Sequence, residues 1–188
     1  MDSDLAEAVD GLKTVFSQRK LALTFGKARP ELVDDLKKKF RVPSRYRNFL
    51  LEANPTQFES ATPVERIRLI PAEEIESTQA QMQNWKPTWI VVAESALLGD
   101  PYFLDVSKPD PEGDCPVMTA MSGQDKWSPT LAASSFAQFL RIIGTAMEVA
   151  TGFSENIMDD EDEESFREAL VPKVKVIDTA ALRAGHWT

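Results

Sequence analysis

The segment Trp89-Ile90-Val91-Val92-Ala93, followed a few residues later by Tyr102-Phe103-Leu104-Asp105-Val106, indicates the centre of the fold. Both segments are rich in β-branched and aromatic residues, which favours strands. The first is apolar at every position, as expected of a strand covered on both faces. Between them, Gly99-Asp100-Pro101 is typical of a tight turn in which Asp100 accepts hydrogen bonds from backbone amides. The two strands therefore form the core of a predicted sheet.

Further strands are expected on either side of this pair. Residues 66–70 alternate between basic and apolar side chains, which is typical of a half-buried strand. Segments 116–121 and 127–131 follow as strands, with Ser122-Gly123-Gln124-Asp125 as a hairpin turn between them. A late strand is predicted over residues 174–177.

Helical spacing of apolar residues, with capping residues and prolines, predicts five helices. Asp4 is expected to cap the first helix, and Ser135 opens the last one with a capping-box pattern. The expected helices cover residues 4–17, 30–40, 44–53, 71–83 and 135–143. Together with the strands they predict an α+β fold, with an antiparallel (mixed) sheet of four to six strands flanked by helices.

The net charge of −9 is distributed unevenly along the chain. Between residues 155 and 168 there are eight acidic residues and one basic residue, Arg167, which gives −7 and leaves −2 for the rest of the chain. A net negative chain without basic blocks argues against nucleic acid or an anionic membrane as a partner. This charge is suited to a basic protein partner.

Three features predict a soluble, cytoplasmic protein. No apolar run approaches the roughly 18 residues that a membrane-spanning helix needs. The segment Met1-Asp2-Ser3-Asp4-Leu5 is acidic where a secretory signal carries Lys or Arg. Cys115 is the only cysteine, so no internal disulfide can form, which suits a reducing compartment.

The sequence contains little of the chemistry that enzymes and metal sites use. Serine and cysteine nucleophiles need a neighbouring base, and the only histidine, His186, lies near the C-terminus, where a frayed or docked structural role is expected. One cysteine and one histidine far apart in sequence make no zinc site. No glycine-rich phosphate loop is present. We therefore expect no catalytic activity, no metal and no cofactor.

Carboxylate pairs are the one catalytic chemistry that the composition leaves open. Glu94, Asp100 and Asp105 flank the central strand-turn-strand, and a paired acid and base there would suit hydrolysis of a glycosidic bond. The turn role of Asp100 is the simpler interpretation. The run Asp159–Glu164 is predicted to be a solvated loop, because it lacks the spaced ligands and the glycine of a calcium-binding EF-hand.

Four segments, in this order, resemble the SUKH superfamily, which groups yeast cell-wall-synthesis regulators of the Smi/Knr type with many bacterial immunity proteins. They are Val42-Pro43-Ser44-Arg45-Tyr46-Arg47-Asn48-Phe49-Leu50 with Asn54; Ile70-Pro71-Ala72-Glu73-Glu74-Ile75; Ile90–Ala93 with Gly99–Asp105; and Pro116-Val117 with Trp127 and Ala133–Leu140. The resemblance covers residues 29–144. The sequence departs from the family pattern at Asn54-Pro55-Thr56, which replaces a glycine pair after the asparagine.

The resemblance implies an α+β domain without a known catalytic site. Bacterial members resemble cytosolic antidotes that bind and neutralise toxin domains, often nucleases or deaminases, whereas eukaryotic members are regulatory adaptors. We divide the chain into an N-terminal helical extension (1–28), a SUKH-like domain (29–144) and an acidic C-terminal extension (145–188) that packs on the domain or trails from it.

Two hypotheses follow, and both describe a non-catalytic protein-binding domain. In the leading hypothesis the chain is an immunity protein that neutralises a basic toxin of nuclease or deaminase type; in the alternative it is a regulatory adaptor for a partner that is not a toxin. A carboxylate-based hydrolase is a weaker third hypothesis. Binding of either kind uses complementary charge and aromatic anchors, although Trp127 also fits a role as half-buried cover of the core. The predicted partner-binding residues are Glu94, Asp100, Tyr102, Asp105, Asp125, Trp127, Asp159, Asp160, Glu161, Asp162, Glu163 and Glu164.

Overall fold

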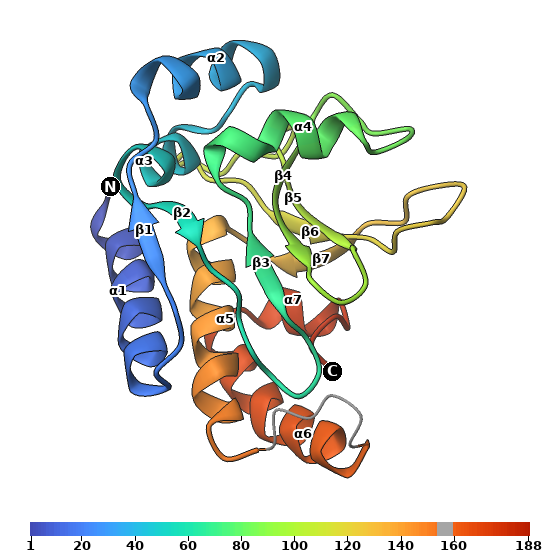
Figure 1. Cartoon of the computed structure of the whole chain (residues 1–188). Helices are drawn as coiled ribbons and strands as arrows, with labels where there is room; N and C mark the ends of the chain where they lie inside the picture. The colour runs from blue at the N-terminus through green and yellow to red at the C-terminus, as the bar shows by residue number, and fades with distance from the viewer. Residues whose placement is uncertain (154–159) are drawn as a thin grey trace.

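The computed structural model describes residues 1–153 and 160–188, and of residues 160 and 161 it describes the backbone alone (Figure 1). Within this part of the chain, a five-stranded sheet, a two-stranded sheet and seven α-helices build the fold. The predicted α+β class is confirmed. None of the helices in the described residues is both long and apolar enough to cross a membrane.

The five-stranded sheet has the order β3-β4-β5-β6-β7, and every neighbouring pair is antiparallel. The two segments that indicated the centre of the fold are β4 and β5, and β5 is the middle strand. All five residues of β5 are buried. The strands are β3 (Ile67–Leu69), β4 (Trp89–Ser95), β5 (Pro101–Asp105), β6 (Val117–Thr119) and β7 (Thr130–Ala133).

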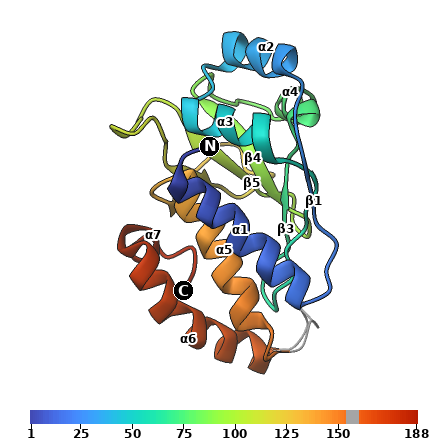
Figure 2. The ribbon, with the colours of Figure 1, turned by 90° about the vertical axis from the view of Figure 1, so that its left-hand side faces the viewer.

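Helices cover both faces of this sheet (Figure 1). On one face lies α5 (Phe136–Ala150), whose Phe139 ring packs 5.1 Å from the Tyr102 ring of β5. On the other face lie α4 (Ile75–Ala80) and the segment after it, where the Trp85 ring packs 4.9 Å from Phe103. Figure 2 shows α1 (Ser3–Gln18) beside α5, on the side away from the sheet.

The remaining elements extend this core at both ends of the chain. Helix α6 packs against α5, and α7 packs against β7. Buried side chains of α1 and α6 belong to the same hydrophobic core as the sheet, Leu12 and Phe166 among them. The other helices are α2 (Pro30–Phe40), α3 (Ser44–Ala53), α6 (Asp160–Ile177) and α7 (Thr179–Arg183).

The small sheet was not predicted. It pairs β1 (Thr24–Gly26) with β2 (Asn54–Gln57), directly after α3. The side chain of Asn54 is buried there: it accepts a hydrogen bond from the Ala72 N–H and donates one to Glu73, both at 2.9 Å. Pro55 and Thr56, which stand where the family pattern has a glycine pair, therefore belong to strand β2. In this strand Pro55 lies opposite Phe25.

One predicted helix cap was wrong. Helix α1 begins at Ser3, and its capping residue is Asp2, whose Oδ1 accepts the Leu5 N–H at 3.0 Å. Asp4 already lies in the first turn, where its carboxylate pairs instead with Arg141 at 2.5 Å. Aspartate stands at both position 2 and position 4. Asp2 is the cap because the helix begins at Ser3, before Asp4.

The predicted strand over residues 174–177 was also wrong, because these residues form the end of α6. Phe166, Leu170 and Val174 follow one another at intervals of four, which places them on one helical face, and all three are buried. Val176, which suggested β alternation with Val174, is 87% exposed. Pro172 lies inside the helix, although proline is usually unfavourable there.

The last strand of the sheet is shifted from its predicted position at residues 127–131 to Thr130–Ala133. Trp127 stays outside the strand: its indole N–H donates to the Gln83 carbonyl at 2.8 Å, and its ring packs edge-on against Trp85 at 5.4 Å. Pro129 has no N–H for strand pairing and directly precedes β7, an edge strand.

A buried hydroxyl generates a test of this packing. Tyr46 in α3 is fully buried, and its hydroxyl has no hydrogen-bond partner among the described residues. Because an unpaired buried polar group costs roughly 1–3 kcal/mol, Tyr46→Phe is expected to raise the free energy of unfolding in urea by about 1 kcal/mol. Tyr102→Phe is the matched control and is expected to lower it, because the Tyr102 hydroxyl is hydrogen-bonded. A destabilising Tyr46→Phe would contradict this account.

Candidate functional site

Exposed apolar side chains gather at one end of the five-stranded sheet. Among the described residues, the large hydrophobic side chains that are exposed are Leu97, Leu98, Met121 and Val176. The first three lie in two connections, β4–β5 and β6–β7, with Leu98 69% and Met121 66% exposed. We call Leu97, Leu98 and Met121 the turn patch. Contiguous exposed apolar patches are typical of interaction sites, which makes these residues a candidate site.

Hydrogen bonds join the two connections that carry the turn patch. The Asp100 carboxylate accepts the Ser122 N–H at 2.7 Å, and the Ser122 hydroxyl donates to the Leu98 carbonyl at 3.2 Å. Gly99 and Gly123 both have a φ of +73°, a backbone conformation that favours glycine. The turn patch is therefore a preformed surface, and Asp100 acts as the turn residue that the sequence predicted.

A groove of about 560 Å³ lies beside the turn patch, between residues 78–84, the β4–β5 connection and the β6–β7 connection. It brings together three of the predicted partner-binding residues: Glu94, Asp125 and Trp127. Glu94 is partly exposed and pairs across the strands with Arg68 at 2.8 Å. Asp125 is exposed and Trp127 is half-buried. We call this the acidic groove.

Two other predicted site residues lie away from this surface. Tyr102 is buried, with its ring against α5. Asp105 is buried at the far end of β5, where its Oδ1 accepts hydrogen bonds from the N–H and the hydroxyl of Ser107. In the register of β4 and β5, Asp105 lies opposite Trp89, and Glu94 lies opposite Pro101. The carboxylates of Asp105 and Glu94 are therefore at opposite ends of this strand pair.

The acidic run was predicted to be a solvated loop, but its described residues begin α6. Asp159 lies outside the described residues, and the backbones of Asp160 and Glu161 are helical. Glu163 accepts a hydrogen bond from Arg167, one turn further on, at 3.0 Å. Acidic residues in a first helical turn complement the positive end of the helix dipole, which favours a helix over a loop.

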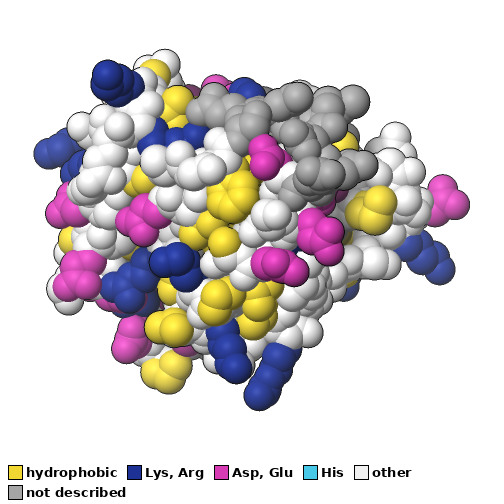
Figure 3. Space-filling view, turned by 90° about the horizontal axis from the view of Figure 1, so that it is seen from below, with side chains coloured by type: hydrophobic (Ala, Val, Ile, Leu, Met, Phe, Trp, Pro, Cys, Tyr) yellow, Lys and Arg dark blue, Asp and Glu magenta, His cyan; other side chains and the backbone are white. Residues whose placement is uncertain are grey.

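The space-filling view from below shows charges of both signs on the described part of that face (Figure 3). Asp and Glu side chains are interspersed with Lys and Arg, and hydrophobic side chains lie between them. The described surface of this face is therefore mixed in sign, unlike the concentration of charge that the sequence suggests between residues 155 and 168.

A largely buried polar cluster joins the C-terminal segment to the sheet, with Tyr102 buried and Glu65 and His186 half-buried. The Tyr102 hydroxyl lies 3.0 Å from His186 Nε2 and 3.5 Å from a Glu65 oxygen. The other Glu65 oxygen accepts the Ser95 hydroxyl at 2.8 Å. Burial raises the pKa of the Glu65 carboxyl. Burial, together with the nearby positive charge of Arg167, lowers the pKa of His186 to about 4.

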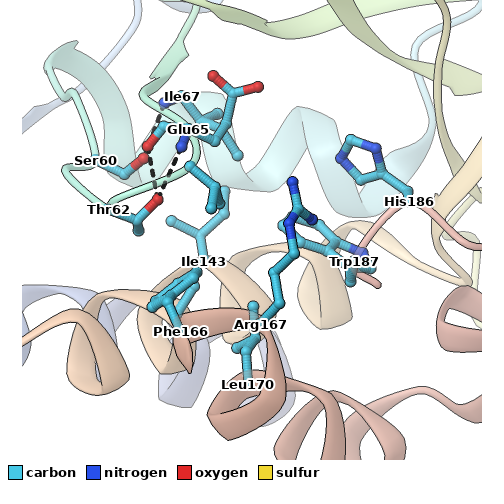
Figure 4. A pocket seen from close by; sticks show the side chains of 12 residues that line it. Ser60, Thr62, Glu65, Ile67, Ile143, Phe166, Arg167, Leu170, His186 and Trp187 are labelled. Atoms are coloured by element: carbon cyan, nitrogen blue, oxygen red, sulfur yellow. Dashed lines mark hydrogen bonds between the residues drawn. The ribbon is translucent and has the colours of Figure 1, made fainter. Parts of the chain in front are cut away.

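A small, partly open pocket of about 70 Å³ lies between this cluster and helices α5 and α6 (Figure 4). Glu65 and Arg167 face it from opposite sides, and Ile143 and Phe166 form part of its apolar wall. The polar groups of Ser60 and Thr62 at its edge are hydrogen-bonded within the segment 60–67. The pocket has room for about two water molecules of ~30 Å³ each, and is too small for a typical organic ligand.

The same C-terminal segment also covers the edge of the sheet. The Trp187 indole N–H donates to the Ala132 carbonyl of β7 at 2.7 Å. Asp178 caps α7 through the Ala181 N–H and accepts hydrogen bonds from both the backbone and the side chain of Ser134. His186 is therefore docked, and not frayed.

Sequence reasoning missed the turn patch itself. Leu97 and Leu98 were assigned no role from the sequence, and Met121 was expected at the end of a strand. The available signal was the pair of leucines next to Gly99, since two successive apolar residues in a turn cannot both be buried by a sheet. Among the described residues, no group of three His, Cys, Asp or Glu side chains is arranged to hold a metal ion.

The geometry defines a class of protein: an α+β domain with a preformed apolar and acidic surface at the strand ends. Within this class, the model of the SMI1 / KNR4 family (SUKH-1) matches residues 27–142, more than half of the chain. The chain belongs to this family, as the four sequence segments suggested. A comparison with curated proteins gives no match. Helix α1, the end of α5 and the whole segment after α5 lie outside the matched residues.

The docked histidine generates a pH prediction. A folded-state pKa of about 4, against 6.5 in a free histidine, means that protons bind the unfolded chain more tightly. The stabilising contribution of neutral His186 is therefore complete above pH ~6.5 and is lost as the pH falls towards about 4, by roughly 2–3 kcal/mol.

The measurement is the difference in unfolding free energy between the wild type and His186→Gln, followed from neutral to acidic pH. Taking the difference is necessary because the raised pKa of Glu65 acts in the opposite direction, while Arg167 and Asp100 also influence His186. We expect the advantage of the wild type to shrink as the pH falls. A difference that stays constant with pH would show that His186 is not buried in its neutral form.

Proposed function

We propose that this protein is a non-catalytic, cytoplasmic binding domain that serves as an immunity protein and neutralises a basic toxin domain of nuclease or deaminase type. The observation that carries the proposal is the turn patch, a preformed group of exposed apolar side chains bordered by the acidic groove. Membership of a family with immunity proteins among its relatives supports the same function.

The energetics of recognition favour this surface. The exposed side chains of Leu97, Leu98 and Met121 gain most of their hydrophobic free energy only when a partner covers them, at about 25 cal/mol per Å² of buried apolar area. The connections that carry them are already hydrogen-bonded to each other. Little conformational entropy is therefore lost on binding, and this pre-organisation strengthens affinity.

The state of the potential catalytic groups supports a non-catalytic role. Glu94 is engaged by Arg68, and Asp105 by Ser107 and Lys108. His186 is hydrogen-bonded to Tyr102. Cys115 is buried, and burial raises the pKa of its thiol to about 12, which leaves almost no reactive thiolate at neutral pH.

The principal test takes as toxin candidate a basic nuclease or deaminase domain sought among the proteins encoded by the adjacent genes. Co-expression is expected to restore growth, and the purified pair is expected to form a complex. Leu98→Asp should weaken that complex by ~30-fold, about 2 kcal/mol, because the variant places a charge at the centre of the contact. Val176→Asp is the matched control: it adds the same charge at an exposed apolar residue of α6, outside the turn patch, and should change little. Equal protection by the Leu98→Asp variant would contradict the proposed surface.

The acidic run is proposed to affect the rate of association more than the final affinity. Exposed charges are screened within about 8 Å at physiological salt, so they steer encounters and contribute little to the packed contact. Replacing Asp159–Glu164 with Ser or Gln is expected to lower the association rate at low salt and to leave it nearly unchanged at high salt. Stopped-flow binding measurements test this, and an unchanged rate at low salt would assign the run to the stability of α6 alone.

A further inference from the structure

We propose that the acidic groove receives an arginine side chain of the partner, while the turn patch contacts the apolar residues around that arginine. This inference rests on the proposed function and adds a specific chemistry to it. It follows from the charges that line the groove, from the orientation of Trp127 and from the rigidity of the groove's walls.

The charges in and around the groove favour a cation. Glu94 and Asp125 are its charged lining residues, and no Lys, Arg or His lines it within the part of the chain that the structure describes. Arg68, which pairs with Glu94, also pairs with Glu74 at 2.8 Å. Glu74 and Arg68 lie outside the lining, so the groove itself presents two carboxylates, Glu94 and Asp125, and its wall carries no cation among the described residues. Most of the other lining residues are uncharged polar ones.

Trp127 distinguishes a guanidinium from other cations. Its indole N–H is held by the Gln83 carbonyl, and its ring stands nearly perpendicular to Trp85, at an interplanar angle of 85°. This fixed, half-buried ring lines the groove near two carboxylates. A planar guanidinium can stack on an aromatic ring and donate paired hydrogen bonds to a carboxylate at the same time, which the compact ammonium of lysine cannot do.

The walls of the groove are formed before a partner arrives. Gly99 and Gly123 hold left-handed backbone conformations in the two connections, and Asn84 does so in the third wall, with a φ of +56°. The hydrogen bond from Trp127 to Gln83 joins the β6–β7 connection to the segment after α4. A volume of about 560 Å³ admits an arginine side chain together with part of the backbone that carries it.

The test uses small probes and needs no partner. The indole ¹H–¹⁵N signal of Trp127, assigned with Trp127→Phe, is followed while N-acetyl-arginine amide, N-acetyl-lysine amide or neutral N-acetyl-citrulline amide is added. The arginine probe is expected to shift the signal saturably, with an affinity at least ~3-fold higher than that of the lysine probe. The citrulline probe has the same shape without the charge, and is expected to cause no saturable shift.

Variants locate the response. Glu94→Gln combined with Asp125→Asn is expected to weaken binding of the arginine probe by at least ~5-fold, because it removes the charges that attract the cation. Glu31→Gln is the matched control, since Glu31 is an exposed carboxylate in the first turn of α2 and does not line the groove. It should leave the binding unchanged.

Three results would overturn the inference: no saturable shift with the arginine probe, equal affinity for the citrulline probe, or an undiminished response in the double variant. Each is separate from a failure of the proposed function. If the probe fails while complex formation with the toxin candidate stays sensitive to Leu98→Asp, the arginine assignment falls and the binding surface stands. If the probe binds while the toxin candidate is not bound, the groove stands and the immunity role falls.

Discussion

The rest of the fold depends on the buried contact between Asp114 and Arg45. Asp114 has no exposed surface, and its Oδ1 accepts the N–H groups of Cys115 at 2.7 Å and Phe136 at 3.0 Å. Its other oxygen lies 3.4 Å from an Arg45 nitrogen. Burial raises the pKa of Asp114, while these donors favour its charged form. Removing Arg45 would leave the fully buried Asp114 carboxylate without an opposite charge in the interior, which is costly. Removing Asp114 would cost less in charge pairing, because Arg45 also pairs with Asp2 and Glu112.

This contact joins elements from distant parts of the sequence. Arg45 belongs to α3 and also pairs with Asp2 at the start of α1, whereas Asp114 precedes β6 and binds the first N–H groups of α5. The beginnings of two helices are thereby fixed relative to the sheet. Strand β6 then runs from this point towards Met121 and the groove. The position of the candidate binding surface therefore follows from an ion pair at the opposite end of the same strand.

The sequence predicted those parts of the fold in which local pattern and tertiary environment agree. The strands around Ile90 and Leu104 and the helix capped by Ser135 lie where apolar periodicity and capping placed them. The errors fall where a local pattern has two interpretations. Val174 and Val176 alternate as in a strand, and only the partners of Phe166 and Leu170 on α5 select the helix. The turn patch needed the folded structure for a related reason: the pair of leucines before Gly99 indicates exposure, but only the fold shows that Met121 lies in the neighbouring connection.

Both edges of the five-stranded sheet are covered by other segments of the chain. At the β3 edge, the Ser60 N–H donates to the Ile67 carbonyl, and the Ile67 N–H donates to the Ser60 hydroxyl. At the β7 edge, Trp187 covers Ala132, and Asp178 binds the residue after the strand. Backbone groups that would otherwise pair with an added strand are thus satisfied within the chain. The segment that covers β7 lies outside residues 27–142, so the C-terminal part of this chain closes an edge of the family core. Covered edges leave side chains at the ends of the strands, where the turn patch and the acidic groove lie, as the surface on which the proposed function depends.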